Sequence, residues 1–119
     1  MRAVLACLVM VACLATYGAA ADASTVSEQN AVREAQQYLQ TEAFSLKGLI
    51  SQLEYSGFTS SQAAYGVARS GANWDQQAAK AAREYLKTQA FSANALIGQL
   101  EYSGFTASQA EYGAKAVGL

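Results

Sequence analysis

The chain contains no histidine and no proline, and its two cysteines, Cys7 and Cys13, both lie near the N-terminus. Histidine is the commonest general base and metal-binding side chain at neutral pH. Because residues 14–119 contain no cysteine, they offer neither a thiol nucleophile nor a Cys-based zinc site. A glycine-rich phosphate-binding loop is also missing. We therefore predict that the protein is not an enzyme and has no catalytic residue, cofactor or metal.

Charged residues are few, at 14% of the chain. From Asp22 onward there are seven Lys or Arg residues and nine Asp or Glu residues, a net charge of about −2. Such a surface does not attract phosphate backbones or acidic lipid head groups. We therefore expect no nucleic-acid partner.

The first 23 residues have the pattern of a secretory signal. Arg2 supplies a positive start, and residues 3–14 are apolar and uncharged, a length too short to span a bilayer comfortably. Small residues follow, and a cut after Ala21 or Ala23 fits the small-x-small rule for cleavage. We predict a signal peptide over residues 1–23 and an exported protein.

Two interpretations of the cysteines stay open. Both residues can serve as small apolar side chains of the signal core, in which case the exported protein has no cysteine. Alternatively, Cys13 is a lipid-attachment site, because Met10-Val11-Ala12 before it resembles a lipobox. A lipid on Cys13 would hold the protein at the outer membrane face, and this anchor is the only membrane contact that we expect.

The rest of the chain is one unit written twice. Residues 38–66 and 85–113 align without a gap at an offset of 47 residues, and roughly 21 of 29 positions are identical. We assign residues 24–70 to the first repeat and residues 71–119 to the second. A single unit of this size would be marginally stable, and the linker at residues 70–72 is short. We therefore expect the two repeats to pack together.

The spacing of apolar residues predicts helices. Apolar residues recur at steps of three and four, and Ala, Gln, Glu and Leu are abundant. The first helix is expected from about Ser27 to Glu42, and the second ends at Gly57. The expected N-terminal caps are Thr25, Ser45 and Thr59 in the first repeat and Asn73, Ser92 and Thr106 in the second. The expected inward-facing residues are Ala31, Ala35, Tyr38, Leu39, Leu46, Leu49, Ile50, Leu53, Ala63, Gly66 and Val67.

These signals predict an all-α protein of two tandem three-helix repeats, similar to helix-turn-helix units, packed together after the signal segment. The four phenylalanines, Phe44, Phe58, Phe91 and Phe105, are expected in the cores. Trp74 lies where the repeats meet, and we expect it to clamp one repeat to the other.

A motif recurs from Ala31 to Tyr65 and from Ala78 to Tyr112, with a shared core of Phe-Ser, Leu-Ile-x-Gln-Leu-Glu-Tyr and Gly-Phe-Thr. This motif resembles the Ltp family of host cell surface-exposed lipoproteins. The resemblance implies tandem helical repeats behind an export signal. It also implies, for members encoded by phages, superinfection exclusion, in which a surface-anchored protein stops the DNA of an incoming phage from entering.

The candidate partner-binding residues are polar or aromatic and repeat in both copies: Gln52, Glu54, Tyr55, Tyr65, Gln99, Glu101, Tyr102 and Tyr112. Tyr55 and Tyr102 lie opposite the apolar stripe, beside small residues. They either pack against another helix or form a recognition surface, since tyrosine suits interfaces. Half-exposed packing is the favoured interpretation for Tyr65 and Tyr112.

Glu54 and Glu101 are not a plausible catalytic pair. They occupy equivalent positions, so nothing supplies the difference in environment that an acid and a nucleophile need.

We therefore expect an exported protein, secreted or on the cell surface, that binds a protein partner at the cell envelope. In the more specific form of this hypothesis, the partner is a component that an incoming phage uses for injection. A structural or envelope-binding protein with no phage role is the alternative. The oligomeric state is left open by the sequence.

Overall fold

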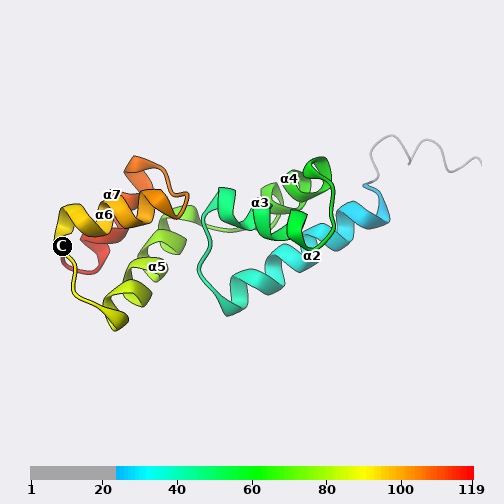
Figure 1. The fold of residues 1–119 in the computed structure, drawn as a ribbon. Helices are drawn as coiled ribbons and strands as arrows, with labels where there is room; N and C mark the ends of the chain where they lie inside the picture. Colours follow the sequence, from blue (N-terminus) through cyan, green and yellow to red (C-terminus); the bar gives the residue numbers. More distant parts are fainter. Residues whose placement is uncertain (1–23) are drawn as a thin grey trace, which may run out of the picture.

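The computed structural model describes residues 24–119, which form six α-helices and no strand (Figure 1). The predicted signal segment, including Cys13, lies outside the described residues. The helices are α2 (Val26–Thr41), α3 (Leu46–Tyr55), α4 (Ser60–Ala68), α5 (Trp74–Thr88), α6 (Ala93–Tyr102) and α7 (Ala107–Ala116). The all-α prediction is confirmed.

Each helix is preceded by the residue predicted to cap it. The hydroxyls of Thr25, Thr59 and Thr106 each accept a hydrogen bond from the third residue of the helix, and each capping box is complete. Ser45, Asn73 and Ser92 cap the other three helices. These caps satisfy amide groups that have no partner inside a helix.

The ends of α3 and α6 form the same turn. In α3 the amide of Phe58 donates to the carbonyl of Leu53, and the amide of Gly57 donates to that of Glu54. This Schellman pattern needs a left-handed residue, and Gly57 supplies it with a φ of 110°. The turn folds Phe58 back onto the helix, and Phe105 repeats the arrangement in the second copy.

Each repeat has its own core. The core of the first repeat contains Ala35, Leu49, Leu53, Ala63 and Val67. The core of the second contains Ala78, Ala81, Ala82, Leu96, Leu100, Phe105, Ala110 and Ala114. The predicted core positions of the phenylalanines are confirmed, with Phe105 buried and the other three partly buried against these cores.

The predicted inward position of Leu46 is wrong, since its side chain is 41% exposed. Only Leu49 and Leu53 are fully buried on α3. At 100° per residue, Leu46 lies about 40° from the midpoint of these two and Ile50 about 80° from it on the same side, so the helical wheel alone places Leu46 nearer the core than Ile50. Ile50 is partly buried against the core, whereas Leu46, in the first position of the helix, is left in solvent.

The closest helix packing occurs at two glycines. A Cβ atom on Gly66 of α4 would lie 2.6 Å from the backbone carbon of Ala31 in α2. A Cβ atom on Gly113 of α7 would likewise lie 2.8 Å from the carbonyl oxygen of Ala78 in α5. Only a residue without a side chain allows the third helix of each repeat to lie this close to the first.

The repeats pack together, as predicted, through a small head-to-tail junction. The amide of Phe44 donates to Gln77 Oε1 at 3.0 Å, and Lys80 Nζ donates to the carbonyl of Leu39 at 3.2 Å. Trp74, at the start of α5, packs against the core of the first repeat, and Ala43 packs against the core of the second. Trp74 therefore connects the repeats as expected.

Replacing Gly66 with Ala should destabilise the protein by about 1–3 kcal/mol, because the new methyl group meets backbone atoms that cannot easily move. Gly98→Ala is the matched control. Gly98 is an exposed residue inside α6, and no atom lies within 4 Å of the place that its Cβ would occupy, so this change should stabilise by about 1 kcal/mol through helix propensity. Urea unfolding followed by circular dichroism measures both. Effects of the same sign would contradict the packing.

Candidate functional site

The predicted binding residues divide into two groups. Gln52 and Gln99 are half-buried and belong to internal hydrogen-bond networks. Gln52 Nε2 donates to Tyr38 Oη at 3.3 Å, and Gln99 Nε2 donates to Tyr85 Oη at the same distance. These amides hold the first helix of a repeat against the second, so their side chains are engaged inside the protein.

The network closes at the serine that follows each second helix. Ser56 Oγ donates to the carbonyl of Gln52 at 3.2 Å. Because its hydrogen is used there, Tyr38 Oη donates to Ser56 Oγ, at 3.0 Å. Ser103, Gln99 and Tyr85 form the same network in the second repeat. The sequence pattern did not indicate this role of the two tyrosines and two serines.

The other group faces solvent. Tyr55 is 89% exposed and Tyr102 is 88% exposed. Each is the last residue of its helix and follows an exposed glutamate, Glu54 or Glu101. We call these two surfaces the Glu-Tyr ends of α3 and α6. The interpretation in which Tyr55 and Tyr102 pack beneath another helix is wrong for residues 24–119, because no helix in that range covers either ring.

Tyr65 and Tyr112 are used locally. The Arg69 guanidinium lies 3.8 Å from the centre of the Tyr65 ring, one helical turn away. Tyr112 is 41% exposed, and its hydroxyl accepts a hydrogen bond from Gln76 Nε2 at 2.8 Å. Both rings are thus half-exposed side chains that pack on neighbouring residues.

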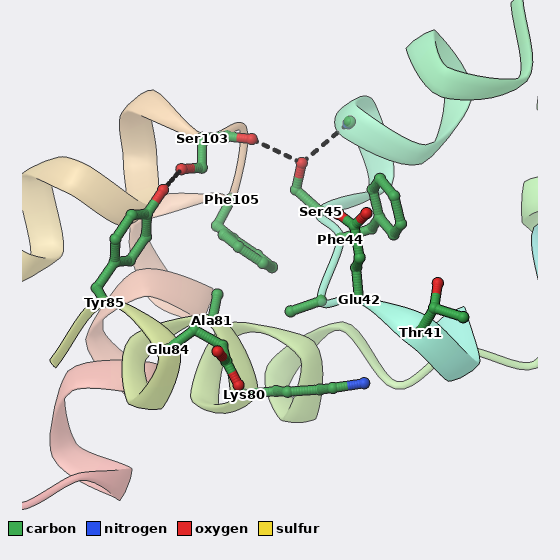
Figure 2. A pocket seen from close by; sticks show the side chains of 12 residues that line it. Thr41, Glu42, Phe44, Ser45, Lys80, Ala81, Glu84, Tyr85, Ser103 and Phe105 are labelled. Atoms are coloured by element: carbon green, nitrogen blue, oxygen red, sulfur yellow. Dashed lines mark hydrogen bonds between the residues drawn. The ribbon is translucent and has the colours of Figure 1, made fainter. Parts of the chain in front are cut away.

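The junction between the repeats contains a pocket of about 410 Å³ (Figure 2). Its lining residues come from both repeats: Thr41, Glu42, Ala43, Phe44, Ser45, Gly48, Lys80, Ala81, Glu84, Tyr85, Ser103 and Phe105. Glu42 of the first repeat and Glu84 of the second both line it, together with Phe105 (Figure 2). This pocket was not predicted, since its walls depend on how the repeats are placed.

Ser45 is the central residue of the junction. It is 3% exposed, and its Oγ accepts from the amide of Gly48 at 2.9 Å while donating to the carbonyl of Ser103 at 2.9 Å. Ser92, its equivalent, is exposed and caps α6 through the amide of Ala95. The serine at this position therefore only caps a helix in the second repeat, whereas in the first repeat it caps a helix and also bonds the other repeat.

Within residues 24–119, no helix is long and apolar enough to cross a membrane. That same region has no group of three or more acidic, His or Cys side chains that could bind a metal ion.

The fold and its surfaces define a class: a tandem helical-repeat protein in which the same Glu-Tyr end is presented twice. The family model for host cell surface-exposed lipoproteins, Ltp, matches residues 27–69 and again residues 73–117. The chain belongs to this family, as the motif predicted.

A solved structure with the same fold is that of Ltp, a superinfection exclusion protein from the Streptococcus thermophilus temperate phage TP-J34. The two are 29% identical, with a TM-score of 0.74 over 78% of this chain and 97% of that one. This match agrees with the predicted tandem arrangement. A search of curated proteins found no match.

Ser45→Ala should destabilise the protein by about 1 kcal/mol more than Ser92→Ala. Both changes remove an N-terminal cap, which costs about 1 kcal/mol. Only the first also leaves the carbonyl of Ser103 without its hydroxyl partner in a part-buried site, at a further cost of about 1 kcal/mol. Chemical unfolding of the two variants measures the difference, and equal losses would show that the junction bond adds nothing.

Proposed function

We propose that this chain acts on the outer face of the host cell and excludes phages by binding a protein component of an incoming phage. The observation that carries this proposal is the pair of exposed Glu-Tyr ends on a fold shared with a superinfection exclusion protein. The family is described as exposed on the cell surface, which is where an incoming phage component can be met.

The mechanism is binding rather than chemistry. Tyrosine offers a large, rigid contact area at low entropic cost, and the neighbouring carboxylate adds a charge that a basic partner can meet. Two equivalent ends on one chain allow a partner with two matching elements to bind more tightly than either end alone would allow. Binding of this kind stops the entry of phage DNA by occupying the partner. It therefore needs one molecule of this protein for each partner site that is blocked.

Loss of both tyrosines should abolish exclusion without unfolding the protein. Truncation of a tyrosine central to an interface weakens binding by about 2 kcal/mol, or roughly 30-fold. Because both rings are nearly fully exposed, Tyr55→Ala with Tyr102→Ala should change the free energy of unfolding by less than about 0.5 kcal/mol per site. Phage plating efficiency on cells that express each variant gives the functional readout.

The experiment needs two controls. Gln36→Ala, at an exposed position on α2, should keep full exclusion. Phage adsorption is measured alongside DNA entry, since exclusion should leave adsorption normal and stop entry. Full activity of the double tyrosine variant would reject the Glu-Tyr ends as the binding surface, and normal plating on cells that express the wild-type protein would reject the phage role.

We further propose that Cys13 carries the lipid that anchors the protein. The membership of a lipoprotein family supports this assignment. Mass spectrometry of the exported protein should find an acylated N-terminal Cys13, and Cys13→Ser should release the protein into the medium. Cys7→Ser is the control and should leave it cell-bound. An N-terminus beginning at Asp22 or Ser24 would contradict the anchor.

A further inference from the structure

The junction between the repeats joins two different surfaces. The front surface of the first repeat lies at the start of α3 and contains Ala43, Phe44, Ser45 and Gly48. The back surface of the second repeat contains Gln77, Lys80, Ala81, Ser103 and Gly104. Because each repeat has both surfaces, the junction leaves one of each unused within residues 24–119, namely the back surface of the first repeat and the front surface of the second.

The unused surfaces keep part of the contact, with Ser27 in the place of Trp74 and Ala95 in the place of Gly48. Ala90-Phe91-Ser92 on the free front surface repeats Ala43-Phe44-Ser45. Ser56-Gly57-Phe58 on the free back surface repeats Ser103-Gly104-Phe105. In the junction, a side chain on Gly104 would overlap Ser45, whereas a Cβ on Gly57 would have no atom of the described residues within 4 Å. The free glycine turn therefore has room for a serine like the one that Gly104 contacts.

The polar residues of the free back surface are also equivalent in kind. Asn30 takes the place of Gln77, the amide side chain that accepts from the Phe44 backbone. Arg33 takes the place of Lys80, which donates to the carbonyl of Leu39 near the end of α2. Each replacement keeps the hydrogen-bonding group and the charge. In the single chain Arg33 Nη2 donates to Asn30 Oδ1 at 2.7 Å, so association would exchange this exposed hydrogen bond for contacts to the next copy.

The residues that line the internal pocket differ from their equivalents on the free surfaces. Ala81 lines the internal pocket, and its equivalent in the free back surface is Glu34, which is larger and charged. The two glutamates of the internal pocket, Glu42 and Glu84, have Gln89 and Gln37 as their equivalents. In a junction between free surfaces, the Glu34 side chain would enter a space of about 410 Å³ and meet two amides instead of two carboxylates.

From this pattern we propose that copies of the chain associate head to tail, with the back surface of the first repeat seated on the front surface of the second repeat of the next copy. The occupant of both free surfaces is thus a second copy of this chain. A contact between two different surfaces leaves one of each surface free at the ends, so it adds molecules in an open row unless the rotation between copies closes a ring. This association follows from the internal junction and is independent of the proposed phage role.

The association should be weak in dilute solution. Inside the chain a short linker holds the repeats at an effective concentration on the order of millimolar, and separate molecules lack this help. A small contact of this type therefore forms at high concentration or where molecules are crowded on one surface. In such a row the Glu-Tyr ends would be repeated along the assembly.

Analytical ultracentrifugation of the exported protein, purified from producing cells, tests the proposal from dilute solution to about 1 mM, the range in which a linker-free junction should form. The wild-type protein should show a mass that rises with concentration, with no fixed end point. Ala90→Arg on the front surface and Glu34→Arg on the back surface should each give a monomer at every concentration. Ala90→Ser is the matched control and should associate like the wild type.

Mixing the two arginine variants tests whether a back surface pairs with a front surface. Ala90→Arg keeps its back surface and Glu34→Arg keeps its front surface, so the mixture should form a one-to-one dimer and nothing larger. Gln37→Arg serves as a second back-surface variant, and melting curves show that each variant is folded. A wild-type mass that never rises, association that survives Ala90→Arg, or a mixture that stays monomeric would each overturn the proposal.

Discussion

The contact between a glycine in the third helix and the backbone of the first helix sets the geometry of each repeat. Gly66 lies against Ala31, and Gly113 lies against Ala78, at distances that leave no space for a methyl group. This approach brings the third helix close enough for the second helix to rest on it through two leucines, Leu49 and Leu53 in the first repeat. A core this small, built largely of alanine, buries enough area only because the helices are so close.

The position of the repeats depends on a second contact of the same type, between Ser45 and Gly104. Ser45 is both the cap of α3 and the residue on which the turn after α6 rests, so the local start of a helix and the tertiary junction share one hydroxyl. The pocket beside it follows from this placement, because its walls belong to separate repeats that touch at few points.

Much of the fold could be predicted because its signals are local. Caps, the left-handed Gly57 and the inward Ala63, Gly66 and Val67 depend on residues within one or two turns, and the structure confirms them. The role of Ser45 could not be predicted, since Ser92 has nearly the same neighbours in sequence and lies in solvent. The exposure of Tyr55 was open for a similar reason: a helical wheel shows that the ring leaves the core, but not whether another helix covers it.

The identical Leu-Glu-Tyr-Ser-Gly segments of the two repeats contain residues that the fold needs and residues that it does not need. Leucine, serine and glycine are needed for the core, the hydrogen-bond network and the turn. The glutamate and tyrosine are not, since among residues 24–119 no side chain packs over Tyr55 or Tyr102 or forms an ion pair with Glu54 or Glu101. The surroundings of the two ends also differ, because the turn after Tyr102 lies in the junction, while the turn after Tyr55 has no such contact in the described part of the chain. Identity at exposed positions with unequal neighbours is not required by the fold, and it supports the proposal that a partner contacts the glutamate and tyrosine themselves.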